Sequence, residues 1–120
     1  MDDRFLQQLK KGVLEMLVLA LICAAPAYGY ELLQKLKDSS CGLFVLKEGT
    51  LYPILYRLED DGMIESSWFQ GKSRAAPKKI YTATEQGRRE YARRKDVWTA
   101  FAGAVESFIK EVGRDETQPH

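Results

Sequence analysis

Residues 47–81 constrain the fold more than any other stretch of the chain. Residues 48–59 read Glu-Gly-Thr-Leu-Tyr-Pro-Ile-Leu-Tyr-Arg-Leu-Glu, with leucine and isoleucine at helical spacing, which predicts a short helix with one buried face. Two strand-like runs follow at residues 64–70 and 78–82, joined by a loop at 71–77. No acidic residue lies between Ser66 and Thr84, so this hairpin is basic. A helix that fits a major groove beside a basic β-wing is the layout of a winged helix-turn-helix.

The rest of the chain supplies the other elements of such a fold. Apolar periodicity predicts helices at residues 4–24 and 28–38, and residues 43–46 form a short apolar run that we expect to be a third strand. Thr84 is expected to cap a last helix that reaches about Val112. The predicted fold class is mainly α with a small β-wing. We expect a winged helix-turn-helix domain at 1–83, a dimerisation helix at 84–112 and a frayed tail at 113–120.

The predicted surface for DNA combines one helix face with the wing. The leucines leave the other helix positions free, and the wing adds four cations that can pair with phosphate. Pro53 is expected early in the helix, where a missing amide costs little. The candidates are Thr50, Tyr52, Pro53, Tyr56 and Arg57 on the helix, and Lys72, Arg74, Lys78 and Lys79 in the wing. The alternatives are that Tyr52 or Tyr56 is half-buried packing and that the wing is a solvated charged loop.

The last helix carries a heptad pattern. Tyr91, Trp98, Val105 and Val112 are seven residues apart, and Phe101 and Phe108 fall three beyond two of them, with Arg94 as a polar d position. Such a seam is longer than a small head can cover, so we expect a homodimer. Phe5 and Leu9 of the first helix would add to its interface. The alternative is that the stripe packs only within its own chain.

Composition excludes several other classes of protein. The chain has 120 residues, 45% of them hydrophobic and 29% charged, with a net charge of +1, which suits one globular domain. Its two cysteines, Cys23 and Cys41, form no metal-binding pattern, so we expect reduced thiols and neither metal nor cofactor. The single histidine, His120, and the lack of any nucleophile or phosphate-loop motif argue against an enzyme.

Two further patterns bear on location. The apolar run at residues 16–25 is half of a membrane span, and the acidic opening Met-Asp-Asp is unlike a signal peptide, so we expect a cytoplasmic protein without membrane contact. The competing reading of the whole pattern is a winged helix that binds proteins without binding DNA.

Four blocks of the chain resemble the PadR family of transcriptional regulators, in its branch with a short C-terminal part. They are residues 28–32, residues 48–59 with 62–64, residues 79–82 with 84–88, and Trp98 in the last helix. The resemblance covers roughly residues 10–110 and implies a DNA-binding regulator, here expected to be a repressor of a pseudo-palindromic operator. One departure is the wing tip, where residues 74–77 read Arg-Ala-Ala-Pro in place of the family's Gly-Arg pair.

The resemblance also implies an effector site. A lactococcal multidrug-responsive member of the family has a pore between paired tryptophans, and this chain looks similar to it at Trp98. A flat apolar or aromatic ligand would then lie between two copies of Trp98 and release the DNA, with Leu6, Leu9 and Phe101 as apolar walls. The alternative is that Trp98 only fills the dimer core.

Overall fold

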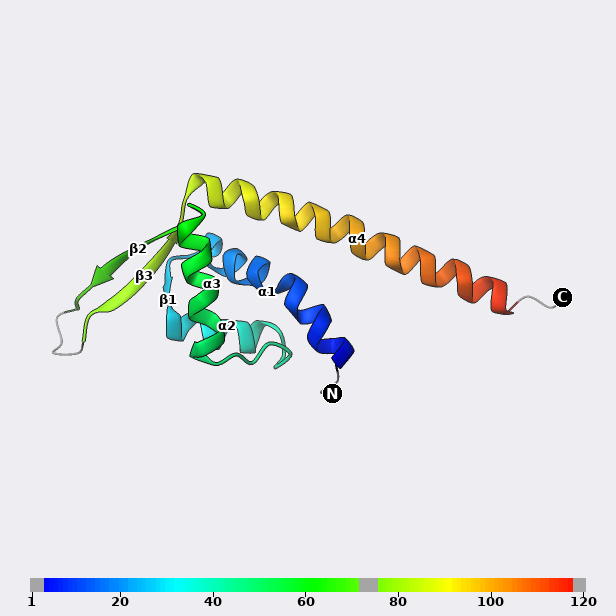
Figure 1. Ribbon diagram of the computed structural model, residues 1–120, viewed down its shortest axis with the longest axis horizontal. Coiled ribbons are helices and arrows are strands. Elements are labelled where there is room, and N and C mark those ends of the chain that lie inside the picture. Colours follow the sequence, from blue (N-terminus) through cyan, green and yellow to red (C-terminus); the bar gives the residue numbers. More distant parts are fainter. Residues whose placement is uncertain (1–3, 72–75, 118–120) are drawn as a thin grey trace.

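Four helices and a small sheet make up the fold of the residues that the structure describes. The computed structural model of the protein describes residues 4–71 and 76–117. In chain order the elements are α1 (Arg4–Ala24), β1 (Ala27–Tyr28), α2 (Gly29–Ser39), α3 (Glu48–Asp60), β2 (Ile64–Phe69), β3 (Lys78–Ala83) and α4 (Glu85–Thr117) (Figure 1). The predicted mainly helical fold with a β-wing is therefore confirmed. The helix expected to stop near Val112 continues to Thr117.

The sheet is antiparallel, with strand order β1-β3-β2. In β1, Ala27 pairs with Tyr81 and Tyr28 with Ile80, so the third strand lies before α2. The prediction of a strand at residues 43–46 is wrong, because this segment belongs to no ladder. Instead, the amide of Phe44 donates to Ser40 Oγ at 2.9 Å and the Phe44 ring enters the core. The apolar run thus serves to bury one ring beside α1 and α2, where Lys10 Nζ of α1 lies 5.8 Å from its centroid.

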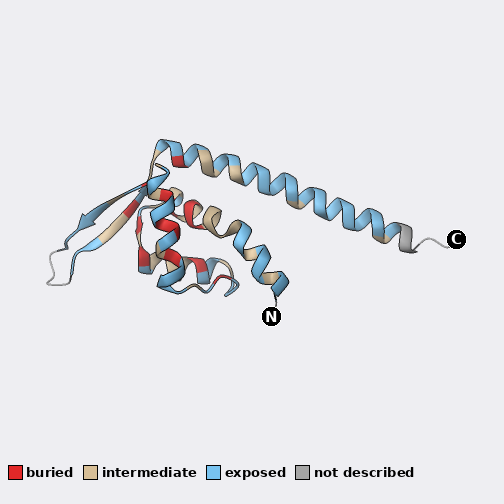
Figure 2. Ribbon diagram, in the orientation of Figure 1, coloured by how far each residue is buried: buried red, intermediate tan, exposed pale blue. Residues whose placement is uncertain are grey.

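The core lies where α1, α2, α3 and the sheet meet. Its members are buried apolar side chains, shown in red in Figure 2: Val18, Leu19, Ile22, Ala27, Leu32, Leu36, Phe44, Leu51, Ile54, Leu55, Leu58, Ile64 and Tyr81. The α3 side chains that the sequence assigned to the core are all among them. Each fully buried leucine contributes about 1.5–3 kcal/mol. This burial fixes which face of α3 points outward.

The end of α3 and the start of α4 are joined by a compact set of hydrogen bonds. Gly62 has φ of +76°, and the amide of Met63 donates to Leu58 O at 2.9 Å, which closes α3. The amide of Thr84 donates to Met63 O at 3.0 Å, while Thr84 Oγ1 accepts from the amide of Gly87 at 3.0 Å. Gly87 lies so close to the Met63 carbonyl that a side chain has no room there.

Helix α4 leaves the head at this joint and projects past it (Figure 1). Its 33 residues span about 50 Å at ~1.5 Å per residue. The first turns contact α1, and Tyr91 packs against the core. Beyond Phe101 most of the helix is exposed (Figure 2). In the described part of the chain, no helix is long and apolar enough to cross a membrane.

Candidate nucleic-acid interface

The outer face of α3 carries the candidates for base or phosphate contact. Thr50, Pro53, Tyr56 and Arg57 are exposed, opposite the buried leucine face. Pro53 is the sixth residue of α3. The expectation that it lies in the first turn, where backbone amides have no partner within the helix, is therefore wrong. Because proline has no amide hydrogen, the carbonyl of Gly49 lacks its usual donor within the helix. This carbonyl lies in the first turn of α3, at the end that would enter a groove.

Tyr52 and Tyr56 differ in how they are held. Tyr52 is half-buried and packs against the core, and a Cβ built on Gly29 would lie 2.5 Å from its hydroxyl oxygen. The ring of Tyr56 lies 6.5 Å from that of Tyr52, centroid to centroid, and its side chain is 57% exposed. Packing therefore applies to Tyr52, which α2 supports from behind, and Tyr56 presents most of its ring to solvent.

Arg57 is engaged with α1 rather than left free. Its Nε donates to Glu15 Oε2 at 3.4 Å. The other oxygen of the same carboxylate, Oε1, accepts from Arg94 Nη1 at 3.1 Å. On the opposite flank of α3, Ser66 Oγ of β2 donates to Glu59 Oε2. The last turn of α3 is thus held by polar contacts on both sides, one to α1 and one to the wing.

The wing brings lysines and aromatic rings together beside α3. Lys78 Nζ lies 4.4 Å from the centroid of the Tyr28 ring, and Lys79 Nζ lies 5.9 Å from that of Trp68. Lys72 and Arg74, the two candidates at the tip, fall outside the described residues. Attraction between cation and ring holds the two lysines near the surface, and within residues 4–71 and 76–117 no carboxylate pairs with either of them.

A concavity of about 400 Å³ separates α3 from the wing. Its walls include Tyr28, Tyr30 and Trp68, which the sequence reasoning did not select, together with four candidates: Tyr52, Tyr56, Lys78 and Lys79. Tyr30 is 62% and Trp68 71% exposed. The Tyr-Gly-Tyr sequence at 28–30 was the available signal, but it becomes part of this surface only because β1 pairs with β3. Hydroxyls, lysines and exposed rings around one hollow suit an oxygen-rich anionic chain.

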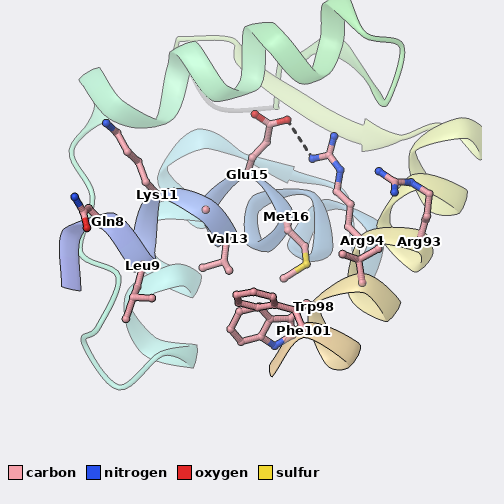
Figure 3. Close-up of a pocket in the computed structure, with 12 residues that line it drawn as sticks. Gln8, Leu9, Lys11, Val13, Glu15, Met16, Arg93, Arg94, Trp98 and Phe101 are labelled. Carbon is pink, nitrogen blue, oxygen red and sulfur yellow. Dashed lines mark hydrogen bonds and ion pairs between the residues drawn. The ribbon is translucent and has the colours of Figure 1, made fainter. Parts of the chain in front are cut away.

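A second hollow lies between α1 and α4. It has a volume of about 610 Å³, and the predicted effector residues Leu9, Trp98 and Phe101 line it, with Met16 and Val13. Figure 3 shows Trp98 and Phe101 below Met16, and the Glu15 carboxylate paired with Arg94 above them. Leu6, the fourth predicted residue, lines a smaller hollow of about 310 Å³ that shares Leu9, Met16 and Trp98 with the first.

Charges at the upper end of the α1–α4 groove are paired. Glu90 accepts from Arg93 Nε at 2.7 Å and approaches Arg94 Nε at 3.4 Å. The hydrogen bond from Arg93 is the largest cause that lowers the pKa of the Glu90 carboxyl. Glu90 thus stays ionised, and Arg94 lies between two carboxylates, those of Glu90 and Glu15.

The predicted seam divides into a covered and an uncovered part. Tyr91 packs on its own core, and Arg94 pairs with Glu15 of the same chain. Phe5 and Leu9 of α1 are exposed. So are the remaining seam residues of α4, which are Trp98, Phe101, Val105, Phe108 and Val112. Val97 and Ile109, exposed beside the seam, were missed. Packing within one chain therefore accounts for the first turns of the seam and leaves the rest bare.

Metal ligands and reactive thiols were the two other kinds of site that the described residues could hold. Within residues 4–71 and 76–117, no three His, Cys, Asp or Glu side chains gather as metal ligands would. Burial raises the pKa of the Cys23 thiol, an effect that Arg88 partly opposes, so this thiol is a poor nucleophile. Both cysteines are free thiols.

Comparison with known proteins agrees with this geometry. The model of the "Transcriptional regulator PadR-like family" matches residues 18–93. A PadR family transcriptional regulator from Eggerthella lenta DSM 2243 is 33% identical, with a TM-score of 0.77 over 88% of each chain. A PadR-like regulator from Bacillus cereus strain ATCC 14579 is 31% identical, with a TM-score of 0.74 over 85% of this chain and 96% of that one.

A relative of undetermined role extends the match. An uncharacterized protein from Lysinibacillus sphaericus is 28% identical over 100 residues, which are 83% of this chain and 91% of that protein. The matched residues 18–93 span the end of α1, the whole helix-turn-helix, the wing and the start of α4. The chain is therefore a DNA-binding regulator rather than an enzyme, and it belongs to the PadR-like family of transcriptional regulators.

Proposed function

We propose that this protein is a homodimeric repressor that binds a pseudo-palindromic operator through α3 and the wing of each protomer. The observation that carries the proposal is the hollow between α3 and the wing, with its lysines, tyrosine hydroxyls and exposed rings. Thr50, Pro53, Tyr56 and Arg57 would face the groove, and Tyr52 would support Tyr56. Lys78 and Lys79, with Lys72 and Arg74 of the wing tip, would bind phosphates. Residues 1–83 would act as the DNA-binding unit, in the cytoplasm.

The dimer would form through the bare part of α4. Five exposed apolar side chains recur there at heptad spacing between Trp98 and Val112. A continuous exposed apolar stripe of this kind is typical of a protein–protein interface. Phe5 and Leu9 of α1 would extend the same contact. Two reading heads on a two-fold axis would fit half-sites about 34 Å apart, one turn of DNA.

Sedimentation equilibrium tests the dimer with a matched pair of variants. Val105→Glu places a charge in the seam and should give a monomer at micromolar concentration. Ser107→Glu adds the same charge two residues later, outside the seam, and should leave the dimer intact. A wild-type protein that stays monomeric at that concentration would remove the dimer from the proposal.

An effector would bind beside Trp98. The groove is large enough for a small planar ligand, and its walls are aromatic and aliphatic, as ligand sites usually are. In a dimer the two tryptophans would approach each other across the two-fold axis. In a Trp68→Phe background, quenching of emission by a planar aromatic dye would report on Trp98. Because Trp98→Ala in that background leaves no tryptophan to quench, its control is the dye's own fluorescence anisotropy, and dye binding that survives Trp98→Ala would place the dye elsewhere.

DNA binding itself is tested by its salt dependence. The four basic wing side chains of each protomer, placed on phosphates, contribute about −7 to the slope of log K against log salt, at roughly 0.9 per contact. Lys78→Gln with Lys79→Gln should reduce that slope by about 3.6 in a dimer. Arg89→Gln with Lys110→Gln removes the same charge from the outer face of α4 and should change it little. A wild-type slope near −2 would exclude the wing from DNA binding.

A further inference from the structure

Three helices meet at one carboxylate, that of Glu15 on α1. Its Oε2 accepts a hydrogen bond from Arg57 Nε of α3 at 3.4 Å, and its Oε1 accepts one from Arg94 Nη1 of α4 at 3.1 Å. The two pairs differ in exposure, because the side chains of Glu15 and Arg94 are 28% and 27% exposed while that of Arg57 is 58% exposed. The pair with Arg94 is shorter and better shielded from water, and the pair with Arg57 is the looser one.

We propose that Glu15 is a shared acceptor that sets how available Arg57 is to DNA, with Arg94 as the competing donor. This inference rests on the proposed function, because it concerns Arg57 as a contact to DNA. In this proposal Glu15 and Arg94 are positioning residues. They lie away from the outer face of α3, and neither would contact DNA itself.

The competition follows from the number of oxygens. A carboxylate holds an arginine most strongly through two parallel hydrogen bonds, which need both of its oxygens. Because Arg94 occupies Oε1, Arg57 is left with Oε2 alone and uses only Nε. Its two terminal nitrogens remain available to a phosphate. An exposed single contact is weak, so a phosphate can compete for this guanidinium.

Loss of Arg94 would reverse this balance. Both oxygens of Glu15 would then be open to Arg57, and a two-bond pair would draw the guanidinium toward α1 and away from DNA. Arg94 also borders the groove beside Trp98, as Figure 3 shows. Any occupant of the groove that takes Arg94 off Glu15 would act in the same direction. Occupancy of the groove would thus reach the reading helix through two ion pairs, without a movement of any helix.

The probe is a labelled duplex taken from the region upstream of the encoding gene that the protein protects in a footprint, and its binding is followed by fluorescence anisotropy. Arg94→Gln should weaken binding about fivefold, from two exposed contacts per dimer, and lower the salt slope by about 1.8. Glu15→Gln should bind at least as tightly as the wild type. In the Glu15→Gln background, Arg94→Gln should have no further effect, because the shared acceptor is gone.

Two variants separate this route from a general effect of charge or folding. Arg93→Gln removes the same charge one residue earlier, where the partner is Glu90 and not Glu15, and should stay within about twofold of the wild type. In an Arg57→Gln background the loss caused by Arg94→Gln should disappear, whereas a loss that came from loosening of α4 would remain. Equal losses for Arg93→Gln and Arg94→Gln, or an Arg94→Gln loss that persists in the Glu15→Gln or Arg57→Gln background, would overturn this inference and leave the proposed function standing. Absence of wild-type binding at ~50 mM salt would overturn the proposed function with it.

Discussion

Replacement of Gly87 by alanine is the sharpest test of how the head is joined to α4. Gly87 is near the start of α4, and a Cβ on it would collide with the carbonyl group of Met63. That carbonyl also accepts the amide of Thr84 at 3.0 Å, and Thr84 in turn caps α4 through the amide of Gly87. The three atoms nearest to such a Cβ all belong to the backbone of Met63, so the clash cannot be relieved by rotation of a side chain.

The expected cost can be worked from these contacts. Overpacking against fixed backbone costs about 1–3 kcal/mol, and weakening of one cap hydrogen bond adds about 1 kcal/mol. Alanine in place of glycine returns about 1 kcal/mol of helix propensity. Gly87→Ala should therefore lower the free energy of unfolding by about 1–3 kcal/mol. Urea unfolding followed by circular dichroism measures it, at one fixed protein concentration because a dimer's stability depends on concentration.

Gly103→Ala is the matched control on the same helix. Nothing lies within 4 Å of a Cβ built there, and the position is on the outer side of the heptad. Only the gain in helix propensity remains, so this variant should be more stable by up to about 1 kcal/mol. The reasoning fails if both substitutions shift stability in the same direction, since the joint at Met63 would then exert no steric constraint.

Three further predictions concern single side chains. Tyr56→Phe removes one exposed hydroxyl and should weaken operator binding about fivefold in a titration, with urea unfolding unchanged; an equal loss of stability would make Tyr56 a packing residue. Burial raises the pKa of Tyr81 to about 12, so the unfolded chain releases its proton first, and stability should fall between pH ~10 and pH ~12. Tyr81→Phe should flatten that part of the pH–stability curve; a fall that persists has another source. Gly29→Ala should press on the hydroxyl of Tyr52, and in a DNA titration its loss of binding free energy should exceed its loss of unfolding free energy in urea. Gly12→Ala, with open space around its Cβ, should leave DNA binding unaltered.

Local patterns were enough to predict most of the fold. The leucines of α3 repeat at helical spacing, Gly62 has the positive φ that ends a helix, and Thr84 caps α4 as its residue type suggests. These features depend on neighbours within a few residues, so they can be read from the sequence. The third strand could not be placed, because β1 has two residues and is defined by pairing with β3, more than fifty residues later.

The candidate surface was predictable as a set of residue types and not as a set of contacts. Exposed lysines and tyrosines follow from composition and spacing, but the pair of Arg57 with Glu15 joins residues 42 apart, and no pattern in either helix signals it. Gly87 gave the opposite difficulty. In the sequence it is a mild defect in a helix, and only the approach of Met63 explains why a side chain is excluded there.

Because the joint at Gly87 fixes the head on α4, the number of residues between this joint and the exposed seam determines how the head is rotated about the helix axis. Between that joint and the bare seam, each residue inserted or deleted would turn the head by about 100° about the helix axis and shift it by ~1.5 Å. A change of seven residues would turn it by only about 20°. In a paired molecule, relatives that differ in the length of this segment should therefore differ in steps of seven, because other steps would aim the two reading helices at different faces of the DNA.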